Sequence, residues 1–153
     1  LEKLRTNFPN QRFALEVDGP IPSMKLDRMA MVSVIRNLLE NAVKYTPKEE
    51  TIVVDIYCKN NSLIFKVADK GIGVPDVEKE KIFEKFYRIG NEDTRKTQGT
   101  GLGLSLVKQI VTAHKGSITV RDNYPQGAIF HLSIPLNLEQ VGEKNPVLAE
   151  HAI

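Results

Sequence analysis

The chain has 153 residues and a formal net charge of +2, enough for one domain of ordinary size and too little positive charge to indicate nucleic-acid binding. A chain of this length buries most of its apolar surface on folding, so it needs no structural metal, and its single cysteine, Cys58, excludes an internal disulfide. It has no apolar run of the roughly 18 residues that a membrane-spanning helix needs, and no cluster of aromatic and basic residues for stacking bases.

The first third of the chain predicts a linker, a strand and a long helix. Residues 1–10 are polar and end in a Pro-Asn pair, as linkers do, and residues 12–17 alternate as a strand would. A loop rich in Gly and Pro follows. Asp27 is a suitable N-cap for a helix over residues 28–45, which Pro47 ends because proline disfavours helical backbone in the residue before it.

The middle of the chain predicts a hairpin, a glycine loop and a short helix. Residues 51–57 and 63–67 are rich in β-branched and aromatic side chains, and the polar residues between them indicate a hairpin turn. Residues 69–75 contain two glycines and a proline, so we expect a loop there. Residues 77–86 can form a short helix.

The last third predicts a polar loop, a helix and a second hairpin. Residues 88–99 have no hydrophobic periodicity, so we expect a mobile loop. Residues 102–114 have helical spacing, and Gly116 stands where the end of a helix favours positive φ. Residues 117–121 and 128–135 predict two strands. One side of the predicted helix carries four apolar residues: Leu102, Leu106, Ile110 and Ala113.

Elements in this order predict an α+β fold of two layers. We expect a mixed, mostly antiparallel sheet of about five strands with about three helices on one face. Residues 137–153 form a polar tail without a clear pattern, as a disordered segment would. The chain starts with Leu1 rather than Met, so we expect it to be a piece of a longer protein.

The long helix carries an unusual polar row made of Asn37, Asn41 and Lys44. At about 100° per residue these side chains share one side of the helix. Amide oxygens suit Mg²⁺, and a lysine charge suits phosphate, so the row predicts half of a Mg-nucleotide site. A solvated helix face that carries two asparagines explains this segment equally well. The opposite side of the helix is apolar: Met31, Ile35, Leu38, Leu39 and Ala42.

A glycine-rich segment, residues 99–103, opens the predicted helix near Leu102. Glycines let backbone N–H groups approach an anion, and a helix N-terminus favours negative charge. A P-loop requires Lys and then Ser or Thr after its last glycine, whereas Leu104 and Ser105 follow here. A Rossmann fingerprint must follow a strand, which this segment does not. It is therefore a phosphate loop of a third kind, or a flexible start to a helix.

A second candidate site begins at Asp69, directly after a predicted strand. An ionised carboxylate accepts hydrogen bonds and cannot donate them, so it would recognise an amine such as the N6 group of adenine. Gly71 and Gly73 follow at close spacing. An ordinary Asp-x-Gly turn has the same sequence.

Taken together, four motifs resemble those of one family, in the family's order. They are an N box at residues 37–45, a first glycine box at 69–75, an F box at 82–88 and a second glycine box at 99–104. Over roughly residues 11–136 the chain resembles the catalytic and ATP-binding domain of a sensor histidine kinase, of the GHKL ATPase superfamily with its Bergerat fold.

The resemblance implies a role for each residue of these motifs. Asn41 would coordinate Mg²⁺ on the ATP phosphates. Catalytic roles would fall to Asn37, Lys44 and Arg88. Asp69 would bind the adenine amine. The other nucleotide contacts would come from Tyr45, Gly71, Gly73, Gly99, Thr100, Gly101, Leu102, Gly103 and Leu104. Arg95 is a weaker candidate than Arg88 for reaching the γ-phosphate.

The resemblance also implies partners. Phe83 and Phe86 would anchor an ATP lid over about residues 76–100 and contact a separate dimerisation domain that carries the acceptor histidine, although core packing gives the same spacing. From that histidine the phosphoryl group would pass to an aspartate of a response regulator. The histidines of this chain lack the setting of the acceptor, so we expect the chain to bind Mg-ATP without phosphorylating itself: His114, His131 and His151.

A kinase function is favoured over hydrolysis by the residue at position 37. Related hydrolases carry a Glu there, and the amide of Asn37 cannot act as a general base near neutral pH. Glu40 has the spacing from Arg36 of a surface ion pair, which contributes little stability. Two alternatives stay open: a serine kinase of the anti-sigma type, and a nucleotide-sensing module without phosphotransfer.

The resemblance finally implies where the domain works. We expect a cytoplasmic domain that is monomeric in isolation and makes no contact with membrane or nucleic acid. Residues 1–10 would then be the linker from the dimerisation domain. The parent protein would be anchored in the cell membrane.

Overall fold

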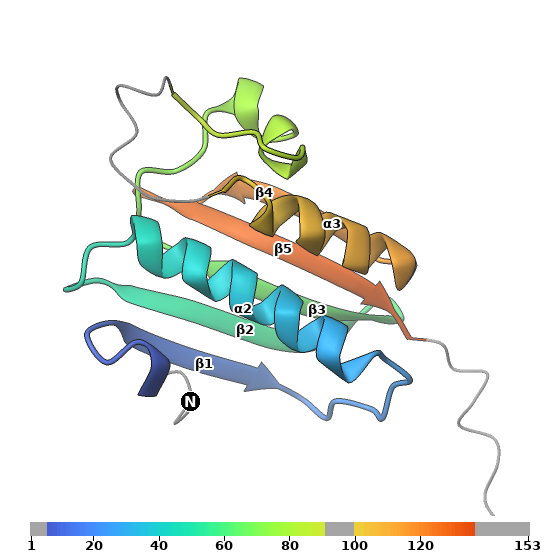
Figure 1. Ribbon diagram of the computed structural model, residues 1–153. Coiled ribbons are helices and arrows are strands. Elements are labelled where there is room, and N and C mark those ends of the chain that lie inside the picture. Colours follow the sequence, from blue (N-terminus) through green and yellow to red (C-terminus); the bar gives the residue numbers. More distant parts are fainter. Residues whose placement is uncertain (1–5, 91–99, 137–153) are drawn as a thin grey trace, which may run out of the picture.

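The computed structural model describes residues 6–90 and 100–136, which form one five-stranded sheet with helices on one of its faces (Figure 1). The first part of the expected linker, most of the expected loop over residues 88–99, and the tail lie outside the described residues. The strands are β1 Arg12–Asp18, β2 Thr51–Lys59, β3 Ser62–Ala68, β4 Ser117–Asp122 and β5 Ala128–Pro135. The helices are α2 Arg28–Tyr45 and α3 Gly103–Ala113, with the 3₁₀ helices η1 Asp76–Glu78 and η2 Lys81–Phe83.

The sheet is mixed and mostly antiparallel, with strand order β1-β2-β3-β5-β4. Only β1 and β2 are parallel among the described strands, and α2 makes the crossover that parallel neighbours need. The other pairs, β2 with β3, β3 with β5, and β4 with β5, are antiparallel. The predicted α+β fold of two layers is confirmed.

Helix α2 begins and ends where its sequence predicts. The Asp27 carboxylate caps it by accepting a hydrogen bond from the backbone N–H of Ala30, at 3.0 Å. It ends at Tyr45 because Thr46 takes up extended backbone before Pro47. Its buried side faces the sheet and consists of Val34, Leu38, Leu39 and Ala42.

The core lies between the two helices and the inner face of the sheet. Alternate residues of β2, β3 and β5 point inward, as the period of a strand requires. Phe130 of β5 is 1% exposed, and its ring makes an edge contact with that of Phe83, with centroids 6.5 Å apart. Burying one such side chain stabilises the fold by about 1.5–3 kcal/mol, so this layer holds the sheet and helices together.

The hairpin between β2 and β3 is tighter than the sequence predicts. Asn60 and Asn61 both have positive φ, 50° and 56°, which is the conformation of a two-residue type I′ turn. The strands therefore extend to Lys59 and Ser62, which pair directly across the turn.

The predicted helix over residues 77–86 is wrong: the structure has two short 3₁₀ helices there instead. The apolar residues do not repeat at helical spacing, since Ile82 and Phe83 are buried side by side while Val77 is 74% exposed. Lys79 connects this segment to β4 through an ion pair with Asp122, at 2.8 Å, and forms a second ion pair within the segment, with Asp76, at 2.5 Å.

The buried side of α3 also differs from the apolar side expected from its sequence. Val107 and Val111 are fully buried, whereas Leu102 and Leu106 are 39% and 41% exposed. The helix turns its valines toward α2 and the sheet, which leaves the two leucines on an accessible surface.

The end of α3 corrects the expectation for Gly116. Lys115 has the positive φ, 58°, while the N–H groups of Lys115 and Gly116 donate to the carbonyls of Thr112 and Val111 in a Schellman motif. Gly116 is needed for a different reason. A Cβ on it would lie 2.5 Å from the Ser133 carbonyl oxygen of β5.

His114 connects the two helices at this end. Its Nδ1 lies 2.8 Å from the Ile110 carbonyl oxygen, and its Nε2 accepts a hydrogen bond from the backbone N–H of Asp27 at 3.2 Å. These partners suit a ring that donates from Nδ1 and accepts at Nε2. Within residues 6–90 and 100–136 no helix is long and apolar enough to cross a membrane.

Substitutions at the end of α3 test which residue needs the left-handed conformation. Lys115→Gly removes a backbone strain of about 1–2 kcal/mol from the folded state, but glycine also gives the unfolded chain more conformational entropy. We therefore expect the unfolding free energy to rise by about 0.5–1 kcal/mol. Gly116→Ala should lose about 1–3 kcal/mol, because the new methyl group meets a backbone oxygen of β5. Urea unfolding measures both. A loss of stability in Lys115→Gly would contradict the assignment.

Candidate nucleotide-binding site

A cavity of about 680 Å³ opens at one end of the two helices. It has the size of a small-molecule site. Its walls come from α2, the loop after β3, the segment after η2 and the start of α3. The lining residues are Asn37, Glu40, Asn41, Lys44, Tyr45, Asp69, Ile72, Gly73, Val74, Ile82, Tyr87, Arg88, Ile89, Thr100, Gly101, Gly103, Leu104, Ala128 and Phe130.

The polar row of α2 faces this cavity. Asn37, Asn41 and Lys44 are all half-buried, so the row is not a solvated helix face. The Asn37 amide nitrogen donates to the Ser33 carbonyl at 2.8 Å, which turns its Oδ1 toward the start of α3. A Cβ on Gly103 would lie 2.7 Å from that oxygen, so glycine permits the close approach of the two helices.

Lys44 brings a positive charge to the cavity without a carboxylate partner among the described residues. Its Nζ lies 5.1 Å from the centre of the Tyr45 ring, within the range of a cation–π contact. Both side chains line the cavity. The ammonium group is therefore available to an anion that enters.

The start of α3 has no capping side chain. Its N-cap, Leu102, offers no side-chain hydrogen bond, and no acidic residue lies in the first turn. The hydroxyl of Ser105 donates to the Leu102 carbonyl at 2.9 Å and does not cap the helix. Because Gly103 and Leu104 line the cavity, the uncapped N–H groups and the positive end of the helix dipole lie at its wall.

Asp69 places a buried carboxylate on the other side of the cavity. The residue is only 3% exposed, and its Oδ1 accepts hydrogen bonds from the backbone N–H groups of Gly71, at 2.9 Å, and Ala128, at 3.1 Å. Burial raises the pKa of this carboxyl group, and the two backbone bonds lower it in part. Both bonds end on Oδ1, which leaves Oδ2 for a ligand.

The glycines after Asp69 have different tasks. A Cβ on Gly71 would lie 2.6 Å from the Tyr45 carbonyl oxygen, so this glycine lets the loop pack on the end of α2 and does not line the cavity. Gly73 has a φ of +73° and does line it. The loop thus needs a glycine at 71 because there is no space for a side chain, and a glycine at 73 because the backbone has a positive φ.

A backbone hydrogen bond joins Phe86, inside the expected lid, to Gly101, just after it. The N–H of Phe86, which has a φ of 65°, donates to the Gly101 carbonyl at 3.0 Å. A Cβ on Gly101 would lie 2.8 Å from the Phe86 carbonyl carbon. Phe86 is 71% exposed, whereas Phe83 is buried against Phe130. Core packing therefore accounts for Phe83, and only Phe86 is left to meet a partner.

The remaining predicted residues divide into three groups. Arg88 and Thr100 line the cavity, and Leu102 does not. Gly99 and Arg95 lie outside the described residues. The expected ion pair between Arg36 and Glu40 is absent from the described part of the chain, and Glu40 lines the cavity.

Sequence reasoning missed most of the apolar wall, formed by Ile72, Val74, Ile82, Ile89 and Phe130. Ile72 and Val74 alternate with the glycines of the first box, which is a signal that could have found them. Phe130 has the inward position of any core residue in β5, so its sequence carries no such signal.

A metal ion would find few protein ligands here. Among residues 6–90 and 100–136 no group of three or more His, Cys, Asp or Glu could hold one. Asn41 offers an amide oxygen, a suitable ligand for a hard cation. Such a site fits Mg²⁺, which takes one or two protein ligands and completes its shell with phosphates and waters.

The described histidines lie away from the cavity. His114 ends α3, and His131 lies on β5 beside Lys66 of β3. Burial, with the charges of Lys66 and Arg121, lowers the pKa of His131. Neither lines the cavity.

An uncapped helix start with a lysine at one wall and a buried carboxylate at the other suits a ligand with phosphates at one end and an amine at the other. The sequence model of one protein family, the histidine kinase-, DNA gyrase B-, and HSP90-like ATPases, matches residues 26–138. The chain belongs to this family.

Similar proteins narrow the family. The sensor protein CiaH of Streptococcus pneumoniae is 44% identical over 110 residues, which are 72% of this chain and 25% of CiaH. The mycobacterial sensor histidine kinase MprB has a TM-score of 0.75 at 28% identity, over 88% of each chain. Full-length ShkA in complex with AMPPNP has a TM-score of 0.74 at 27% identity, over 88% of this chain and 29% of that one. The resemblance to sensor histidine kinases is confirmed.

Asp69→Asn tests the burial of the carboxylate without any ligand. Because the folded wild type keeps the Asp69 proton to a higher pH than the unfolded chain, its unfolding free energy falls as pH rises from the ordinary carboxyl pKa to the raised one. The variant has no carboxyl group to titrate, so its unfolding free energy does not fall in this way. The difference in unfolding free energy, variant minus wild type, should therefore rise between the two pKa values and stay constant above them. Urea unfolding at a series of pH values measures the difference; a flat difference would contradict the raised pKa.

Proposed function

We propose that this chain is the ATP-binding catalytic domain of a sensor histidine kinase. It binds Mg-ATP and transfers the γ-phosphoryl group to a histidine on a separate dimerisation domain, from which the group passes to an aspartate of a response regulator. The main observation is that the polar row of α2, the uncapped start of α3 and the buried carboxylate of Asp69 all line one cavity. The relatives CiaH, a sensor protein, and ShkA, bound to AMPPNP, support it.

ATP lies with its base at Asp69 and its phosphates at α3. The free Oδ2 of Asp69 accepts a hydrogen bond from the adenine amine, while Ile72, Val74 and Phe130 supply an apolar wall for the ring. The Lys44 ammonium and the N–H groups at the start of α3 bind the phosphates. Asn41 holds Mg²⁺, which neutralises phosphate charge when bound.

Transfer to a presented nucleophile follows from the side chains that the cavity offers. Phosphoryl transfer mainly requires positioning and charge stabilisation. Asn37 supplies an amide that is held by Ser33 and cannot take a proton from water near neutral pH. Lys44 and Arg88 stabilise charge on the transferred group. Water is therefore a poor nucleophile here, and a histidine delivered by another domain is the acceptor.

The dimerisation domain docks beside the base of the lid. Phe86, Leu102 and Leu106 are exposed apolar side chains of neighbouring segments, joined by the bond between Phe86 and Gly101. The covered surface would place the acceptor near the start of α3. The whole protein is anchored in the cell membrane with this domain on its cytoplasmic side.

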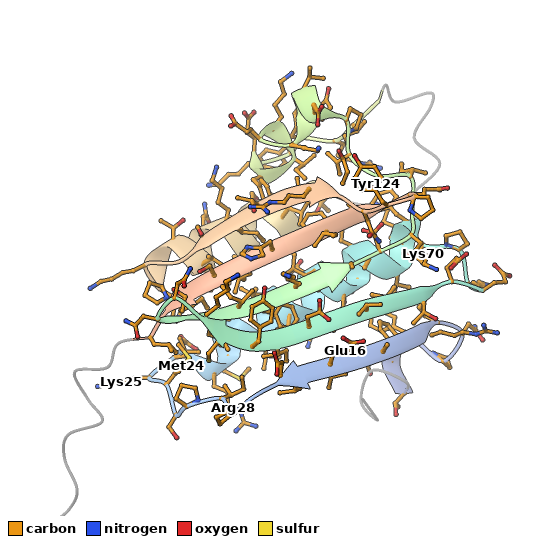
Figure 2. All side chains as sticks on the ribbon, turned by 180° about the vertical axis from the view of Figure 1, so that it is seen from behind. Glu16, Met24, Lys25, Arg28, Lys70 and Tyr124 are labelled. Carbon is orange, nitrogen blue, oxygen red and sulfur yellow. The ribbon has the colours of Figure 1, made fainter. Side chains whose placement is uncertain are left out.

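Nucleotide titration tests the site. Asn41→Ala and Asp69→Ala should each raise the Kd for Mg-ATP at least tenfold, a change of about 1.4 kcal/mol, because they remove the metal ligand and the base contact. Glu16→Ala is the matched control, since Glu16 lies on the uncovered face of the sheet (Figure 2) and should bind as the wild type does. Isothermal titration calorimetry measures the three constants. Wild-type affinity in both site variants would refute the assignment.

Phosphotransfer in trans tests the reaction. With labelled ATP and Mg²⁺ the chain alone should gain no acid-labile phosphate, since His114 and His131, the histidines that the structure describes, lie away from the cavity. Addition of a dimerisation domain that carries the acceptor histidine should produce labelled phosphohistidine on that domain. Phosphoserine instead would indicate a serine kinase, and binding of ATP without any transfer would indicate a nucleotide-sensing module.

A further inference from the structure

The hydrogen-bonding pattern between β3 and β5 changes at the end of their pairing, where Asp69 lies opposite Ala128. The N–H of Asp69 donates to the Ala128 carbonyl at 2.9 Å, as in an ordinary antiparallel pair. The reciprocal bond is missing: the Ala128 N–H donates at 3.1 Å to the side-chain Oδ1 of Asp69 and not to its carbonyl oxygen. A backbone donor of the sheet is thus diverted to the carboxylate of the proposed base-binding residue.

The diverted bond leaves the carbonyl oxygen of Asp69 in need of a donor, and Asn123 provides it. The Asn123 side-chain amide donates to that oxygen at 2.8 Å, across 54 positions of sequence. Without this donor, the buried carbonyl would lose a partner or take back the Ala128 N–H. In the second case the carboxylate would lose one of the two bonds that orient it.

The turn between β4 and β5 is shaped for this contact. The backbone N–H of Asn123 donates to the Gly127 carbonyl at 3.0 Å and closes the turn. A Cβ on Gly127 would lie 2.0 Å from the Asp69 carbonyl oxygen, so only glycine lets the two segments touch. Figure 2 shows Lys70 and Tyr124 at the same end of the sheet, where the loop after β3 and this turn are neighbours.

We propose that Asn123 is a positioning residue for adenine recognition: by holding the Asp69 carbonyl it frees the Ala128 N–H to orient the Asp69 carboxylate toward the nucleotide base. The inference rests on the proposed binding of the adenine amine by Asp69. It assigns Asn123 no contact with ATP, since this residue does not line the cavity. Its effect on binding passes through Asp69 alone.

The test compares two nucleotides that differ only at the amine. ATP is one, and the triphosphate of purine riboside, which has hydrogen in place of the amine, is the other. Asn123→Ala should weaken ATP binding about tenfold and leave the purine analogue unchanged, so the preference for ATP falls. Asn123→Asp, which keeps the shape and removes the donor, should do the same. Calorimetry measures binding, and thermal unfolding checks that each variant is folded.

A double-mutant cycle separates positioning from general damage. Added to Asp69→Ala, which removes the carboxylate, the Asn123→Ala change should cause no further loss of ATP affinity, because its route is already removed. An equal loss for both nucleotides, or an additive loss in the double variant, would overturn the role of Asn123. If Asp69→Ala itself keeps the wild-type preference for ATP, the proposed base contact fails, and that result is distinct from failure at Asn123.

Discussion

The buried carboxylate of Asp69 is the constraint around which this end of the molecule is arranged. A charge so little exposed is unfavourable unless it is hydrogen-bonded, and the bonds must come from backbone N–H groups that the sheet would otherwise use. The loop after β3 supplies one through Gly71, and β5 supplies the other through Ala128. The β4–β5 turn then compensates the diverted bond. Three separate segments are held together by the requirements of one side chain.

The opposite wall of the cavity follows a complementary rule, because there the protein leaves groups unsatisfied. Helix α3 starts without a cap or an acidic residue, and Lys44 of α2 has no carboxylate partner in the described part of the chain. Other helix ends of the same chain are capped: Asp27 caps the start of α2, and the Schellman motif around Lys115 caps the end of α3. Uncapped helix N–H groups beside a lysine ammonium are suited to binding an anion.

The elements that local rules govern could be predicted from the sequence. The N-cap at Asp27, the stop before Pro47 and the β-branched strands gave α2 and the sheet, and the four motifs named the family. The 3₁₀ helices escaped prediction because ion pairs of Lys79 and the burial of Ile82 decide them.

Tertiary contacts explain the other differences between the structure and what the sequence predicts. The left-handed residue at the end of α3 is Lys115, since Gly116 is required where β5 passes closely. The bond from Asn123 to Asp69 joins residues 54 positions apart and has no sequence pattern at all. Phe130 lines the cavity as one more inward residue of a strand, indistinguishable by pattern from its buried neighbours.

The bond between Phe86 and Gly101 has a consequence for how such domains can diverge. It closes the connecting segment at its base, so the sheet and helices are complete without that segment, although Tyr87, Arg88, Ile89 and Thr100 within it line the cavity. The number of residues between Phe86 and Gly101 then has little effect on the stability of the sheet and the helices. Doubling the length of a closed loop costs only about 0.6 kcal/mol in chain entropy. The part of this segment between Ile89 and Thr100 can therefore change its length while the sheet, the helices and the cavity-lining residues stay in place.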